Sequence, residues 1–164
     1  MPDMLVPVIL GSRADLEHAR AITKVLDEFG VPHEIRIASA HKATRYLLDM
    51  LAEYEAHVRR RVYITVAGRS NALSGVVDAN VVAPVIACPP YSERFGGMDI
   101  LSSLRMPSGL GVVVVLEPEA AAIAAAKMLA LADEALADRL RRYQERSRLR
   151  IEEDDAALNA SSRD

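Results

Sequence analysis

The sequence predicts an α/β protein, a single domain built on a doubly wound parallel sheet with a long helix near its C-terminal end. Short apolar segments of the kind that form buried strands recur five times along the 164 residues. Between them lie segments whose apolar residues recur every three or four positions, as in amphipathic helices. Regular alternation of strand and helix is typical of a parallel sheet covered on both faces. We therefore expect a flavodoxin-like, three-layer αβα arrangement.

The first strand is predicted over "MLVPVIL", because a continuous apolar run is typical of a strand with both faces covered. The later strand segments are "HEIRIA", "RVYITVA", "PVIAC" and "VVVVL". The five predicted strands thus span residues 4–10, 33–38, 61–67, 84–88 and 112–116.

The first helix is predicted after "GSRAD", and its apolar stripe consists of Leu16, Ala19, Ile22, Leu26 and Phe29. Ser12 and Asp15, three residues apart, resemble a capping box, and Gly30 is a typical helix end. Further helices are expected around 46–54, after "GRSN", near 98–104 and, beginning at Pro118, over the Ala-rich residues 119–132.

We expect two parts in the chain. Residues 1–135 would form the catalytic domain, and residues 136–164 a C-terminal helical extension with a tail. Residues 139–150 carry six arginines, and "EEDD" follows at 152–155. This pattern favours a solvated helix with offsetting charges. Packing against a neighbouring subunit is the alternative.

Composition excludes several classes of protein. The net charge of −3 argues against non-specific nucleic-acid binding. The one cysteine, Cys88, leaves no intrachain disulfide and fits a reducing, cytoplasmic location; we expect it to be buried and unreactive. No apolar run is long enough for a membrane span, and the N-terminal segment is typical of a strand rather than a signal peptide.

Small and polar residues follow four of the predicted strands, in "GSRAD", "SAHK", "AGRSN" and "CPPYS". The carboxyl ends of parallel strands meet at one edge of the sheet, where ligands bind in this architecture. Backbone N–H groups at helix starts there suit an anion. The sequence contains no P-loop, no GxGxxG and no credible metal cluster. ATP, NAD and metal therefore have no support in the sequence.

His41 is the strongest candidate for acid–base chemistry, because it lies at this edge beside Lys42. A neighbouring ammonium disfavours the imidazolium form and would leave His41 able to accept a proton. Ser12 and Asp15 can be capping residues or ligand contacts, and spacing alone leaves both readings open. The other histidines, His18, His33 and His57, are predicted to be structural.

These motifs resemble the PurE family, whose members act on aminoimidazole ribonucleotide (AIR). The resemblance runs from about residue 6 to about residue 132 and rests on "GSRAD", "SAHK", "AGRSNALSG", "PVIACPP" and "SSLRMPSG". Mutases of this family typically have Arg after the histidine and a "GAGGAAHLPG"-like segment. This chain has Lys42 and "VAGRSNALSG" instead, which resembles the class II branch of AIR carboxylases. Animal members typically have Gly at the position of Ala72.

The resemblance implies a chemistry that needs no cofactor. Class II enzymes join CO2 to C4 of AIR and form carboxyaminoimidazole ribonucleotide (CAIR). By resemblance, His41 removes the hydrogen from C4, and Lys42 supplies positive charge toward CO2 or phosphate. The implied CO2 pocket consists of Gly68, Ser70, Asn71 and Ala72, and the implied ribose phosphate site of Ser12, Asp15 and Ser39. Residues 106–109, "MPSG", would close over the base.

Two other functions stay open at this point, the mutase reaction and a non-catalytic nucleotide-binding module. The resemblance also implies a symmetric homo-oligomer, an octamer or tetramer. We expect the Ala-rich helix over 119–132, including Ala125, to pack against copies of itself.

Overall fold

The computed structural model describes residues 3–161, and its centre is a six-stranded sheet in which every pairing is parallel. The strand order is β2-β1-β4-β5-β6, with the short β3 also paired to β1. The strands are β1 (Met4–Leu10), β2 (His33–Ile37), β3 (Arg60–Arg61), β4 (Tyr63–Val66), β5 (Val85–Ala87) and β6 (Val113–Val114). The doubly wound sheet is therefore confirmed, with β3 as a short strand that the sequence pattern did not indicate.

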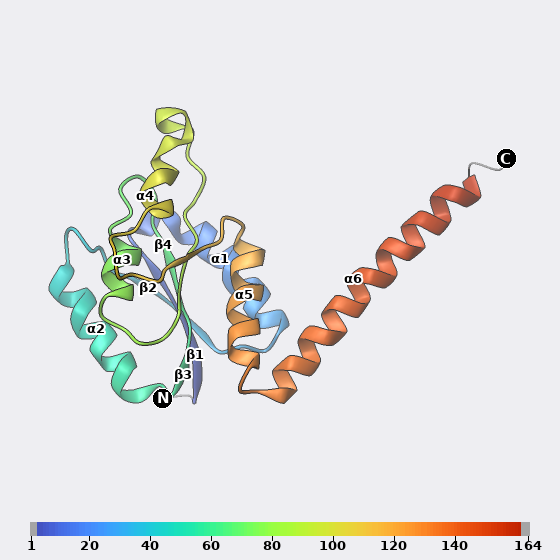
Figure 1. The fold of residues 1–164 in the computed structure, drawn as a ribbon, viewed down its shortest axis with the longest axis horizontal. Coiled ribbons are helices and arrows are strands. Elements are labelled where there is room, and N and C mark those ends of the chain that lie inside the picture. Colours follow the sequence, from blue (N-terminus) through green and yellow to red (C-terminus); the bar gives the residue numbers. More distant parts are fainter. Residues whose placement is uncertain (1–2, 162–164) are drawn as a thin grey trace.

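Helices cover both faces of the sheet (Figure 1). The α-helices are α1 (Leu16–Glu28), α2 (Thr44–His57), α3 (Leu73–Asp78), α4 (Leu101–Leu104), α5 (Pro118–Ala130) and α6 (Glu134–Ser161). Two 3₁₀ helices, η1 (Arg13–Asp15) and η2 (Arg94–Ile100), precede α1 and α4. Helices α1 and α5 lie on one face, and α2 and α3 lie on the other.

Strand β1 is apolar along its whole length because both of its faces are buried. All seven of its residues are buried. Val6, Val8 and Leu10 point into the core beneath α1 and α5, whereas Leu5 and Ile9 point into the core beneath α2 and α3. Alternation along a strand sends successive side chains to opposite faces, so a central strand between two helical layers needs apolar residues at every position.

The Ala-rich helix α5 is buried by its own chain, which corrects the expectation for Ala125. Ala121, Ala122, Ala125 and Ala126 are all fully buried in the core shared with α1 and the sheet. Small side chains let α5 approach α1 closely. These four alanines therefore pack within the chain, whereas Ala120 on the same helix is exposed.

Helix α6 joins the body only through its first turns. Leu136 and Leu140 are buried in the core, and Tyr143 packs edge-on against Phe29 with ring centroids 5.2 Å apart. Residues 144–160 are all exposed, and this part of the helix projects away from the domain in Figure 1. Ion pairs within the helix, such as Arg148 with Glu145 at 2.6 Å, offset its charges. In the single chain this part of the helix is solvated, and packing against a neighbouring subunit remains the alternative.

The boundary predicted between residues 135 and 136 remains a prediction. Since Leu136 and Leu140 lie in the core, the start of α6 packs as part of the domain. No helix among the described residues is long and apolar enough to cross a membrane.

Candidate active site

A cleft of about 940 Å³ lies at the carboxyl edge of the sheet, where the loops after β1, β2, β4 and β5 meet. The chain leaves β1 for β2 on one side and then crosses to β4 on the other. Adjacent loops diverge at such a switch point and leave a crevice for ligands. The cleft is lined by Gly11, Ser12, Ala14, Asp15, Ser39, Ala40, His41, Lys42, Ala67, Gly68, Arg69, Ser70, Leu73, Pro90, Tyr91, Ser92, Glu93, Arg94 and Asp99.

Most of the site residues predicted from the sequence come together in this cleft. The predicted residues that line it are Ser12, Asp15, Ser39, His41, Lys42, Gly68 and Ser70. Asn71 and Ala72 are not among the lining residues, and neither is any residue of 106–109.

The loop after β1 is ordered by its own polar side chains. The Ser12 hydroxyl accepts a hydrogen bond from the Ala14 N–H at 3.3 Å and donates to Asp15 Oδ2 at 3.1 Å. Ser12 is therefore the N-cap of η1, and both residues also face the cleft. The structural and functional readings of Ser12 are compatible.

His41 and Lys42 lie in a tight turn between β2 and α2. Ser39 closes this turn, because its side-chain oxygen accepts from the Lys42 N–H at 3.3 Å and its carbonyl accepts from the Ala43 N–H at 2.9 Å. Thr44 adds a bond to the Ala40 carbonyl at 2.6 Å. Both titratable side chains are exposed and line the cleft.

Small residues allow the loops to approach one another. A Cβ atom at Gly11 would lie 3.4 Å from Cβ of Ala67, and a Cβ atom at Gly68 would lie 3.5 Å from Pro90 Cγ. A Cβ atom at either position would make ordinary van der Waals contact, so the loop after β4 lies directly against the loops after β1 and β5. Gly11, Ala67 and Gly68 all line the cleft, where their small size leaves room for a ligand.

Asn71 supports the cleft from behind rather than lining it. Its side-chain nitrogen donates to Ser74 Oγ at 2.8 Å and to Ser103 Oγ at 2.9 Å, and its side-chain oxygen accepts from the Ser74 N–H at 3.2 Å. Ser74 in turn lies 2.7 Å from the hydroxyl of Thr65. This buried network joins β4, the loop after it, α3 and α4.

Residues 106–109 pack near α3 instead of over the cleft. A Cβ atom at Gly75 would lie 3.4 Å from both Met106 Sδ and Leu110 Cδ1. The expectation that this segment closes over a base is not fulfilled by the cleft of a single chain.

Several lining residues were not predicted as site residues, most notably Arg69, Arg94 and Asp99. Arg69 has φ of 59°, in the left-handed region that non-glycine residues rarely adopt. Such strain is often concentrated at functional sites. Arg69 stands in the "AGRSN" segment after β4, where its position at the sheet edge was the available signal, whereas Arg94 and Asp99 lie in η2 and belong to no familiar motif.

Cys88 is buried, as predicted, and burial together with the nearby Glu117 charge raises its pKa to about 12. Its sulfur lies 3.3 Å from His18 Nε2. Burial of His18 lowers the pKa of that imidazole despite the opposing hydrogen bond and carboxylates. Neither residue lines the cleft, which agrees with their predicted structural roles.

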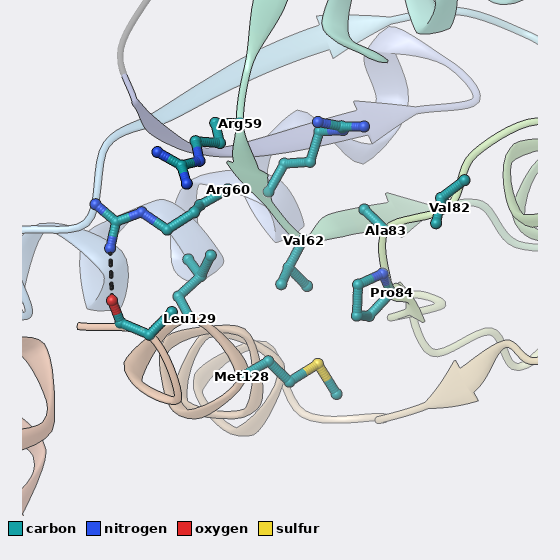
Figure 2. A pocket seen from close by; sticks show the side chains of 10 residues that line it. Arg59, Arg60, Val62, Val82, Ala83, Pro84, Met128 and Leu129 are labelled. Atoms are coloured by element: carbon teal, nitrogen blue, oxygen red, sulfur yellow. Dashed lines mark hydrogen bonds between the residues drawn. The ribbon is translucent and has the colours of Figure 1, made fainter. Parts of the chain in front are cut away.

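Figure 2 shows a second and smaller cavity, of about 290 Å³, at the amino edge of the sheet. Its arginines are largely neutralised: Arg60 pairs with Asp3 at 2.6 Å and Asp133 at 3.1 Å, and Arg61 pairs with Glu55. Arg60 also donates to the Ala132 carbonyl at 3.0 Å, the bond drawn in Figure 2. This cavity has no candidate base among its lining residues, so the larger cleft is the better candidate for chemistry.

Comparison with known proteins agrees with the site. A family model described as AIR carboxylase matches residues 5–149. A protein of Treponema denticola named phosphoribosylaminoimidazole carboxylase is 50% identical over 154 residues, which cover 94% of this chain and 97% of the relative. One of the same name from Archaeoglobus fulgidus is 49% identical and covers 94% of this chain and 85% of the relative.

A solved structure from the same family has a similar fold. The crystal structure of Treponema denticola PurE matches with a TM-score of 0.92 and 50% identity, covering 94% of this chain and 98% of that one. The human bifunctional phosphoribosylaminoimidazole carboxylase/phosphoribosylaminoimidazole succinocarboxamide synthetase is 44% identical over 136 residues, which are 32% of its length. This chain belongs to the AIR carboxylase family.

Proposed function

We propose that this enzyme catalyses the reversible carboxylation of AIR with CO2 to CAIR, a step of de novo purine biosynthesis. The observation that carries the proposal is the pairing of His41 and Lys42 in the cleft at the switch point, in a chain of this family. The closely similar relatives from two organisms are named carboxylases.

The chemistry needs only what such a cleft can supply. AIR is an enamine, so its C4 is nucleophilic, and the CO2 carbon is electrophilic. A bond forms between them, and the electron pair of one C=O bond moves onto oxygen as a carboxylate. C4 then carries both the new carboxylate and its original hydrogen. His41 removes that hydrogen as a proton, and the C–H electrons restore the aromatic ring. In decarboxylation, the same imidazole returns the proton.

The other lining residues divide into two groups by position. Gly68 and Ser70 belong to the loop after β4 and would form the CO2 pocket, with Asn71 and Ala72 fixing its shape from behind. Ser12, Asp15 and Ser39 belong to the loops after β1 and β2 and would hold the ribose phosphate. Lys42 lies in the same loop as Ser39, after β2, and would supply positive charge to the nascent carboxylate or the phosphate.

Carboxylation with CO2 is favoured over the mutase reaction by two features of the chain, Lys42 after the histidine and "GRSNALSG" after β4. Ala72 differs from the glycine of animal members, and its methyl group adds volume behind the loop that would hold CO2. A non-catalytic nucleotide-binding module is disfavoured, because His41 stands at the cleft without a structural hydrogen bond among the described residues.

We further infer that the enzyme works as a cytoplasmic homo-oligomer, an octamer or tetramer. The segment beside the cleft exposes a cluster of large apolar side chains, Tyr91, Phe95, Met98, Leu101 and Leu104, of which Phe95 is 87% exposed. Contiguous exposed apolar surface of this kind is typical of protein interfaces. Closed symmetric assemblies of identical chains are the common outcome.

One assay tests the proposed reaction. The purified protein is mixed with AIR and bicarbonate in the absence of ATP, and CAIR is followed by its absorbance. Formation of CAIR supports the proposal. Turnover only with the N-carboxylated nucleotide would instead identify a mutase, and nucleotide binding without turnover a binding module.

A further inference from the structure

Asp99 carries a buried carboxylate oxygen that the mechanism has not used. Its Oδ2 atom is buried, and no hydrogen-bond donor within residues 3–161 reaches it. An ionised carboxylate can only accept hydrogen bonds, and burying one without a donor costs free energy. Such an orphaned acceptor in a native fold requires an explanation. Asp99 also lines the cleft, so a rotation of its carboxylate on ligand binding would bring this oxygen to a donor of the ligand.

Asp99 is held next to the loop after β4. The Ser102 hydroxyl lies 2.8 Å from the Asp99 carbonyl oxygen and 2.9 Å from the Arg69 carbonyl oxygen. The same hydroxyl accepts from the Asn71 N–H at 3.0 Å. Ser102 therefore joins the backbone of Asp99 to the loop that contains Gly68 and Ser70.

The chemistry of AIR offers two kinds of donor, the ribose hydroxyls and the 5-amino group. Asp15, another carboxylate that lines the cleft, lies in the loop after β1 beside the proposed ribose phosphate site and already accepts a hydrogen bond from Ser12. Asp99 adjoins the loop that would hold CO2, and CO2 reacts at C4. The amino group stands on C5, the next ring atom, and is thus the donor nearest to that loop.

We propose that Asp99 accepts a hydrogen bond from the 5-amino group of AIR and so selects for aminated imidazole nucleotides. This inference rests on the proposed function. It also gives Asp99 a part in the reaction. When C4 attacks CO2, the amino lone pair moves into the ring and the nitrogen becomes positive. When His41 removes the C4 proton, the returning electrons neutralise that nitrogen again. A carboxylate at the amino group stabilises the charged intermediate more than the neutral substrate, which accelerates the reaction.

The test is a binding cycle with two ligands and two proteins. The ligands are AIR and the same ribonucleotide without the amino group, measured by calorimetry without CO2 at about pH 8, where an imidazole ring is neutral. The proteins are the wild type and Asp99→Asn, which keeps the size of the side chain and removes its charge. Asp49→Asn, an exposed substitution on α2 that does not line the cleft, is the matched control.

Wild type and the Asp49→Asn control are expected to bind AIR about 10-fold or more tightly than the deaminated nucleotide, as for a hydrogen bond to a charged group. In Asp99→Asn, this preference should fall to about 2-fold or less, and turnover of AIR should fall with it. Asp99→Glu, which keeps the charge, should retain part of the preference.

Three results would overturn the inference. The first is an unchanged preference in Asp99→Asn. The second is equal binding of both nucleotides by the wild type, which can be measured without any variant. Equal weakening of both ligands in Asp99→Asn would show that Asp99 pairs with a cation such as Arg69 or Arg94 instead, and also counts against it. Failure of the wild type to carboxylate AIR at all would refute the proposed function itself. The test of the carboxylase function is therefore separate from the test of the role of Asp99.

Discussion

His41 and Lys42 lie in a turn that Ser39 closes from both sides. A general base has to stand within hydrogen-bond reach of the proton that it removes. A turn held by backbone bonds keeps the histidine at the cleft without using its ring nitrogens. The prediction of these two residues from "SAHK" therefore depended on local geometry that the sequence encodes directly.

At this scale the first prediction is that His41→Asn binds AIR but loses turnover by about 10²-fold or more, the usual contribution of a positioned general base. Steady-state carboxylation and AIR binding are measured separately. His57→Asn, an exposed histidine at the end of α2, is the control and should retain wild-type rates. Near-normal turnover of His41→Asn would remove this residue from the mechanism.

The second prediction is that Lys42→Arg lowers CO2-dependent carboxylation by about 10-fold or more, a barrier increase of about 1.4 kcal/mol. Arginine keeps the charge, but its planar guanidinium is wider and cannot replace a compact ammonium. Lys24→Arg, an exposed position on α1, is the control. Equal rates for Lys42→Arg and wild type would leave the assignment to the carboxylase branch without support from this residue.

At the scale of elements, the loop after β4 depends on the network around Asn71. Asn71→Ala leaves the hydroxyls of Ser74 and Ser103 with fewer partners in a buried site. We expect it to lower the free energy of unfolding by about 1 to 3 kcal/mol and to reduce turnover as the loop loosens. Urea denaturation measures the first effect. Asn80→Ala, at an exposed asparagine, should change stability by less than about 0.5 kcal/mol, and equal losses in the two variants would contradict the role of the network.

Glu55 joins α2 to the sheet and makes stability depend on pH. Its carboxylate accepts from Arg61, from the Tyr63 hydroxyl at 3.0 Å and from the Val82 N–H at 3.3 Å. Burial alone would raise the pKa of Glu55, but these hydrogen bonds lower it overall from its ordinary value of 4.5. A carboxyl whose pKa is depressed by folding contributes stability above that value and loses it at lower pH.

Glu55→Gln should therefore lower the free energy of unfolding by about 1 to 3 kcal/mol at neutral pH. The difference from wild type should begin to shrink as the pH falls below about 4.5, where the unfolded carboxyl becomes protonated, and should disappear as the pH falls through the lower pKa of the folded state. Denaturation over a series of pH values measures it. Glu53→Gln, an exposed position on the same helix, should show little difference at any pH. A gap that does not change with pH would contradict the role of the charge.

At the scale of the whole molecule, the question is what covers the apolar surface beside the cleft. Leu101 and Leu104 are each 56% exposed in the single chain. Ala121, Ala122, Ala125 and Ala126 of helix α5 pack inside the chain and cannot contact a second copy. The segment over residues 91–104 is the better candidate, and it would bring a neighbouring copy to the mouth of the site.

We predict that the wild-type protein has a mass of at least four chains in solution. Leu101→Glu with Leu104→Glu should reduce that mass and depress activity together, because a buried unpaired charge costs several kcal/mol. The conservative pair Leu101→Met and Leu104→Met should keep both. Light scattering coupled to size-exclusion chromatography measures the mass, and an active wild-type monomer would end this proposal.

The sequence by itself determined three things about this protein: the order of strands and helices along the chain, the location of the site at the carboxyl edge of the sheet, and the family. Apolar periodicity is local, so β1 and α1 could be predicted from their own residues, and parallel connections bring the carboxyl ends of all strands to one edge. The turn with His41 and Lys42 followed from the same logic, and the family assigned from the loop motifs is confirmed.

Only the tertiary structure decided which side of an element meets which partner. Ala125 lies against its own chain, Asn71 supports the cleft from behind, and Asp99 enters it from the segment before α4. Each of these depends on contacts between residues far apart in the sequence. The sequence pattern of a helix or loop indicates that an apolar face must be buried or that a polar atom needs a hydrogen bond. Which residues bury that face or form that bond depends on how the whole chain packs.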